Sequence, residues 1–227
     1  LITSPLTTVM LTWLGTPDGL TVALTVPFLF IQSSLPMFFL SVLGATNHPA
    51  FMIAVLEILA LRWAAHDGIK FRQVLAAGIG LAAGYGLVRL FLAVNKIDIV
   101  SRVDFMLLKD AGEWLKMNVL NFPMSIASLF NVHWLILPIC LVMFFKRDRF
   151  FYALALVILL VNYGFTFFSL DTTRIFSLLS WGVLFVCMFH SYSLARAETS
   201  DAPQVQKQFL QSLILIGIVS FVAPRYF

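Results

Sequence analysis

The chain has 227 residues, of which 60% are hydrophobic and only 11% are charged. An average soluble domain carries roughly 25% charged residues, so this composition excludes a water-soluble fold, which could not hide so much apolar surface. The formal net charge of +4 is ordinary for a membrane protein with basic loops and does not indicate nucleic-acid binding.

The apolar runs predict an all-α fold, because backbone groups inside a bilayer must be hydrogen-bonded internally. Runs such as "FYALALVILLVNYGFTFF" (151–168) are apolar at consecutive positions, whereas the strands of a membrane barrel alternate apolar and polar residues. We predict a polytopic transmembrane helical bundle with about eight or nine membrane segments. The runs lie near 4–15, 20–32, 35–46, 50–64, 74–94, 123–145, 150–169, 174–193 and 209–223.

The whole chain, 1–227, is expected to form a single transmembrane domain. It starts with Leu1 almost inside a hydrophobic run, with no initiator Met and no basic segment before that run. We therefore expect it to be the C-terminal part of a longer protein.

The short runs 20–32 and 35–46 are separated by the polar sequence "IQSSLP" (31–36). A full membrane crossing needs about 20 helical residues, so the pair forms either one long span kinked at Pro36 or a hairpin of two short helices. The sequence leaves both alternatives open. In the first, the turn "TPDG" (16–19) lies in the cytoplasm; in the second, it lies on the outer face.

Lysine and arginine are concentrated in three segments, which sets the orientation because these residues favour the cytoplasmic side. The segments are "RWAAHDGIKFR" (62–72), "KRDR" (146–149) and the mixed stretch 194–208. Placing all three in the cytoplasm makes successive helices alternate in direction. The loop 95–122 and the turn "DTTR" (171–174) then share the outer face.

Three features inside the apolar runs predict how the helices pack. Small residues recur at helical spacing in "GIGLAAGYG" (78–86), which permits close approach of a second helix. Glu57 lies mid-run and must face a protein interior or water. Cys140 and Cys187 lie within apolar runs, so we predict small buried side chains and not a disulfide.

The loop 95–122 is predicted to contain an amphipathic helix that lies in the membrane interface. Its apolar residues recur mostly every three or four positions with charged residues between them, and Trp114 is expected at headgroup depth. This helix is either a structural connector or a lid over a cavity on the outer face.

The charged pair Asp171 and Arg174 is the first candidate site. On a helix that starts near Leu170, the three-residue spacing places both side chains on one face. The pair is either a capped helix start with a local ion pair, or a site in which Arg174 faces a lipid phosphate and Asp171 orients it. Arg89 either snorkels to the interface or contributes to the same outward cavity.

The order of features resembles that of the GT-C class of polytopic membrane glycosyltransferases and of polysaccharide polymerases, which use polyprenyl-phosphate-linked sugars. The resemblance covers about residues 16–95, in the order "TPDGLTVALTVPFLF", "IQSS", and then Asn47-His48-Pro49 where such proteins commonly carry a Lys-containing element. "LDTTRIFSLLSW" (170–181) also resembles a D-x-T-R element near the C-terminal spans of some bacterial membrane proteins of this kind.

The resemblance implies the hairpin alternative and an outer-face site for a polyprenyl-phosphate sugar. Arg174 would hold the phosphate, Asp171 would orient it, and Asp18, His48 and Arg89 would contribute to the cavity. The acidic catalytic base of the GT-C class lies in a first outer loop, so we expect the catalytic residue upstream of Leu1.

A non-enzymatic subunit of a larger membrane complex, or a transporter, is the alternative function, favoured by Glu57 and by the break at "IQSSLP". No metal site is predicted, because the four histidines lack metal-ligand spacing. No cofactor is assigned, although a divalent cation is compatible with the transferase. The expected partners are membrane lipids, a polyprenyl-phosphate sugar and other membrane proteins, with no nucleic acid. The expected location is the bacterial inner (cytoplasmic) membrane.

Overall fold

The computed structural model describes residues 18–98, 112, 115–120, 134–166, 172–197 and 202–222, and the side chains of 19–98, 112, 115–120, 134–165, 175–197 and 204–216. All regular elements in this part of the chain are helical, which confirms the predicted all-α class. They are α2 (Asp18–Thr25), the 3-10 helix η1 (Val26–Leu29), α3 (Ser34–Asn47), α4 (Pro49–Ala64), α5 (Phe71–Val94), α8 (Ile136–Phe144), α9 (Arg149–Thr166), α10 (Thr172–Ala197) and α11 (Ala202–Val222). Most of the predicted interfacial helix in 95–122 lies outside the described residues.

Two described helices are long and apolar enough to cross a membrane, namely Phe71–Val94 and Ile175–Ala197. Gly19–Leu29, Ser34–Asn47 and Arg149–Phe165 are also apolar but shorter. By length and composition, the two long helices indicate membrane association. The eight or nine predicted segments remain a prediction, and the predicted run 4–15 lies outside the described residues.

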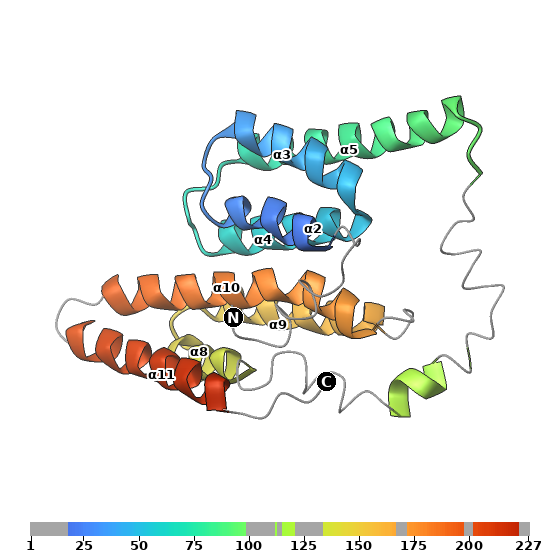
Figure 1. The fold of residues 1–227 in the computed structure, drawn as a ribbon. Coiled ribbons are helices and arrows are strands. Elements are labelled where there is room, and N and C mark those ends of the chain that lie inside the picture. Colours follow the sequence, from blue (N-terminus) through green and yellow to red (C-terminus); the bar gives the residue numbers. More distant parts are fainter. Residues whose placement is uncertain are drawn as a thin grey trace.

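Helices α2 and α3 form a hairpin, which decides between the two alternatives for residues 20–46. Asn47 at the end of α3 donates a hydrogen bond from Nδ2 to Thr21 Oγ1 near the start of α2, at 2.8 Å. In one continuous helix these residues would lie roughly 40 Å apart, at 1.5 Å per residue. The chain therefore reverses after η1, and Figure 1 shows the loop that carries it from this end of α2 to the start of α3.

Arg62, near the end of α4, holds the hairpin turn in place. Its side chain is only 3% exposed. Nη1 donates to the carbonyl oxygens of Phe28 (2.6 Å) and Ile31 (2.9 Å), and Nε donates to Asp67 Oδ2 (2.7 Å). Where η1 ends, backbone carbonyls lack helical partners, and the planar guanidinium supplies donors in a fixed geometry. Arg62 is thus a buried structural residue as well as part of a basic segment.

Helices α3 and α5 approach so closely that two glycines are required between them. A Cβ atom on Gly80 would lie 2.4 Å from the carbonyl oxygen of Phe38, and one on Gly84 would lie 2.5 Å from that of Val42. Gly78 and Gly86, on the same helix, would meet nothing within 4 Å. The close packing predicted from the small residues is confirmed, and the partner is α3.

The second half of the chain packs around α10, the most buried of the long helices. It contacts α4, α8, α9 and α11. Between α9 and α10, the buried hydroxyl groups of Tyr152 and Ser191 form a hydrogen bond, with Oη and Oγ 2.7 Å apart. Cys140 and Cys187 are both buried and free, as predicted.

The basic segments gather at one end of the helices, toward the left in Figure 1. His190 near the end of α10 bonds through Nε2 to Asp148 Oδ2, at 2.9 Å, in the turn between α8 and α9. Asp67, in the segment 62–72, lines the same cavity as His190. The described helices therefore alternate in direction as the basic segments predicted. We call this end the basic end, and the other the opposite end.

Candidate functional site

The N-terminal parts of α2, α4 and α10 pack together at the opposite end. Ala50, Leu178 and Leu179 form a buried apolar cluster there, with Val22 and Ile175 packed against it. Ala50, Val22 and Ile175 lie within the first five residues of their helices, and Leu178 and Leu179 are the seventh and eighth residues of α10. Because the N-terminus of a helix carries partial positive charge, three such ends close together favour an anion. At α4 this contribution is the helix dipole alone, since Pro49 has no amide hydrogen and the amides of Ala50 and Phe51 are bonded to His48.

Two predicted site residues belong to these helix starts. Asp18 is the first residue of α2, and Arg174 is the third residue of α10, directly before Ile175. Their side chains, and the whole of Asp171, lie outside the part that the structure describes. The structure thus brings the chain positions of Asp18 and Arg174 to the same end of the bundle.

His48 lies at this end as the N-terminal cap of α4. It is 6% exposed, and its Nδ1 accepts a hydrogen bond from the backbone amide of Ala50, at 3.0 Å. In the neutral ring, an accepting Nδ1 leaves the proton on Nε2. Pro49 follows at the first helical position, where its missing amide costs nothing. His48 therefore fixes where α4 begins, a role that the sequence analysis did not foresee.

Arg89 lies on a different helix from the other predicted site residues and does not join them. It is exposed on α5, which packs mainly against α3. Its Nε donates to Tyr85 Oη at 2.8 Å, and its guanidinium lies 5.2 Å from the centroid of the Tyr85 ring. Arg89 is accordingly paired within its own helix.

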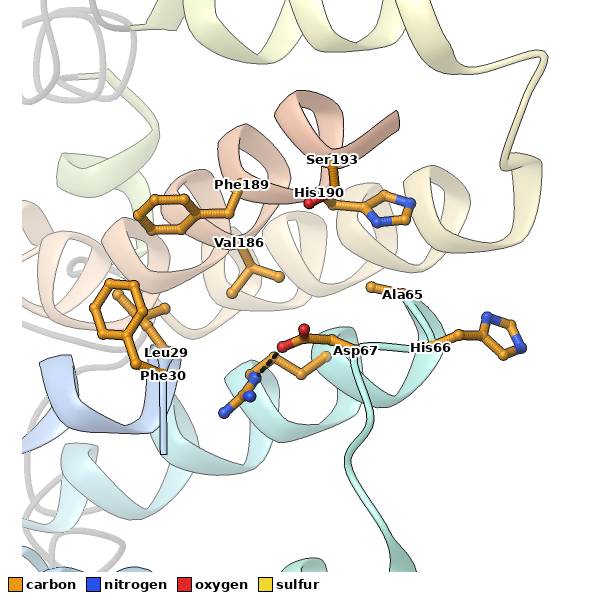
Figure 2. A pocket seen from close by; sticks show the side chains of 10 residues that line it. Leu29, Phe30, Ala65, His66, Asp67, Val186, Phe189, His190 and Ser193 are labelled. Atoms are coloured by element: carbon orange, nitrogen blue, oxygen red, sulfur yellow. Dashed lines mark hydrogen bonds and ion pairs between the residues drawn. The ribbon is translucent and has the colours of Figure 1, made fainter. Parts of the chain in front are cut away.

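A cavity of about 330 Å³ opens at the basic end, between the turn after α4 and the last turns of α10. Figure 2 shows Phe30 and Phe189 on its apolar side. Their ring centroids are 5.4 Å apart. The ion-paired Arg62 and Asp67 also line the cavity. His190, another lining residue, is bound to Asp148. These interactions hold the walls together, so the cavity is a structural junction of α4 and α10.

A polar pair crosses the interior between α4 and α9. Asn162 Nδ2 donates to Glu57 Oε2 at 3.1 Å, and the Asn162 side chain is fully buried. The Oδ1 atom of Asn162 has no hydrogen-bond partner. An interior position was expected for Glu57 but not for Asn162, whose only signal in the sequence is a lone amide in the run "LLVNYGF".

The described residues contain no group of three or more His, Cys, Asp or Glu side chains that could hold a metal ion. No protein-family model matches the chain, and searches of curated proteins and of solved structures found no match.

Proposed function

We propose that the chain is a polytopic membrane protein that binds polyprenyl-phosphate-linked sugars at its outer face, as a GT-C-like glycosyltransferase or polysaccharide polymerase. The observation that carries the proposal is the convergence of the starts of α2, α4 and α10 at the end opposite the basic segments. In this proposal the basic end faces the cytoplasm of a bacterial cell, and the described helices cross the inner membrane.

The proposed chemistry is electrostatic retention of the departing lipid phosphate. The Arg174 guanidinium would donate two hydrogen bonds to phosphate oxygens, and the nearby helix starts would add partial positive charge. Asp171 would orient Arg174, and Asp18 would line the acceptor side. His48 supports the site indirectly, because it fixes the start of α4. The proposal assigns no residue of this chain as the catalytic base. A divalent cation is compatible with the proposed transferase.

Replacing Arg174 by alanine is expected to weaken binding of a short-chain polyprenyl phosphate about tenfold, which corresponds to about 1.4 kcal/mol. Arg174→Lys should lose less, because it keeps the charge but not the planar fork. Binding can be followed by tryptophan fluorescence of the full chain in detergent micelles.

The matched control for that variant is Arg89→Ala, which removes an arginine paired within α5. It should bind the polyprenyl phosphate with unchanged affinity. Wild-type affinity in Arg174→Ala, or an equal loss in Arg89→Ala, would contradict the assigned phosphate site.

Transport is the second candidate function, because the Glu57–Asn162 pair places a carboxyl group in the interior of the helices. The hairpin removes the other feature in its favour, since the break at residues 30–33 is a turn and not an interruption within a span. A transferase should bind polyprenyl phosphate equally well when Glu57 is replaced by glutamine, which keeps the shape and the bond to Asn162. More than a tenfold loss of affinity in Glu57→Gln would instead favour a role for Glu57 in substrate handling.

A further inference from the structure

A second cavity, of about 400 Å³, lies at the basic end between the starts of α3 and α5. Gln73 joins its two walls: Oε1 accepts from the Lys70 amide at 2.5 Å, and Nε2 donates to the carbonyl oxygen of Gln32. Gln73 is itself 7% exposed, and its two partly buried bonds form the floor of the cavity. The lining residues are Gln32, Ser33, Ser34, Leu35, Lys70, Arg72 and Gln73.

The charges of this cavity are all positive. Lys70 and Arg72 line it, and neither forms an ion pair within the described part of the chain. The acidic residue nearest to them in sequence, Asp67, is bound to Arg62. Ser33 precedes α3 and makes no side-chain bond to that helix. Two cations and two hydroxyl groups in a hollow without a carboxylate suit a phosphate group.

Two rows of exposed apolar side chains lead away from this cavity along its two helices. Each row repeats every four residues, which places its members on one helical face. The rows are Leu35, Phe39 and Leu43 on α3, and Phe71, Leu75 and Ile79 on α5. A soluble anion would use only the cavity, whereas a phospholipid would also lay its acyl chains along these rows.

We propose that this cavity binds the phosphate of an anionic phospholipid in the leaflet at the basic end. Cytoplasmic leaflets are rich in anionic lipids, and basic pockets at the ends of membrane helices are suited to their headgroups. The lipid would bridge α3 and α5 at the tip of the hairpin. The inference shares with the proposed function the assignment of the basic end to the cytoplasm. The cavity lies away from the convergence of helix starts, so lipid binding here and substrate binding there can fail separately.

The test is a titration of phosphatidylglycerol into the full chain in zwitterionic detergent micelles, with phosphatidylcholine and inorganic phosphate as parallel probes. The rise of the thermal unfolding midpoint reports binding. The double variant K70Q/R72Q should bind phosphatidylglycerol about 30-fold more weakly, since each cation near the headgroup contributes about fivefold. Phosphatidylcholine and inorganic phosphate should not raise the midpoint of the wild type.

The matched control is K146Q/R149Q, which removes two exposed cations from the same end with the same change of net charge. It should bind phosphatidylglycerol like the wild type. A second variant, Ser33→Asp, places a residue type that is favoured before a helix but puts a negative charge into the cavity, and it too should lose the lipid. Equal losses in K70Q/R72Q and K146Q/R149Q would show general attraction and overturn the proposal. Stabilisation by inorganic phosphate to the same extent, or unchanged binding in Ser33→Asp, would also overturn it.

Discussion

Replacing Arg62 by alanine is expected to lower the free energy of unfolding by about 3 kcal/mol or more. The guanidinium is buried and bonded to Asp67 and to the carbonyl oxygens of Phe28 and Ile31. Its removal leaves the buried carbonyl oxygen of Phe28 and the partly buried one of Ile31 without this donor, and each unsatisfied buried acceptor typically costs about 1–3 kcal/mol. The Asp67 carboxylate is half exposed and can be solvated, so its loss of a partner adds little. The loss should appear in denaturant unfolding of the protein in detergent micelles, followed by circular dichroism.

An exposed arginine provides the comparison for Arg62. Arg149→Ala, at the start of α9, should change the free energy of unfolding by no more than about 0.5 kcal/mol. Arg62→Lys should be intermediate, because an ammonium group cannot reach all three acceptors in the same plane. If Arg62→Ala unfolds like Arg149→Ala, the hairpin turn is not held by this side chain.

Placing leucine at Gly80 is expected to destabilise the protein by about 3 kcal/mol, the upper end of the usual cost of overpacking. The first added carbon would lie 2.4 Å from a backbone carbonyl oxygen and 2.7 Å from the Cβ atom of Ser41. Neither neighbour is the flexible end of a side chain, so α3 and α5 must move apart. The same unfolding measurement reports the cost.

Gly78 is a matched control on the same helix, because a Cβ atom there would meet nothing within 4 Å. Gly78→Leu should stabilise α5 by about 0.5–1 kcal/mol, since leucine has the better helix propensity. A similar loss of stability at both glycines would show that α3 and α5 do not pack as described.

The helices and their directions could be predicted because both depend on signals within one segment. Apolar runs predicted the bounds of α4, α5, α9 and α10 to within a few residues. The positions of lysine and arginine predicted which ends of these helices lie on the same side. The hairpin could not be chosen from the sequence, since "TPDG" and "IQSSLP" contain no lysine or arginine. Its evidence is the contact between Thr21 and Asn47, which depends on how the two helices pack.

The candidate site was predictable only in outline. Loop charges placed His48 and Arg174 at one end, whereas the end of Asp18 depended on the hairpin, which only the resemblance favoured. The cap formed by His48 depends on local backbone geometry. Arg62 was assigned to a basic loop because its carbonyl partners, Phe28 and Ile31, lie more than 30 residues earlier in the chain. Asn162 was missed for a similar reason, since its partner Glu57 lies on another helix.

Thiol labelling from outside intact cells tests most directly whether the proposed substrate end faces outward. Cys140 and Cys187 are buried, so a cysteine introduced at Gly19 or at Ser33 can be read against a low background. Gly19 lies at the start of α2, and Ser33 lies in the hairpin turn at the basic end. A membrane-impermeant maleimide should label Gly19→Cys in intact cells and Ser33→Cys only after permeabilisation. Labelling of Ser33→Cys with protection of Gly19→Cys would contradict the proposed orientation and, with it, the outer-face site.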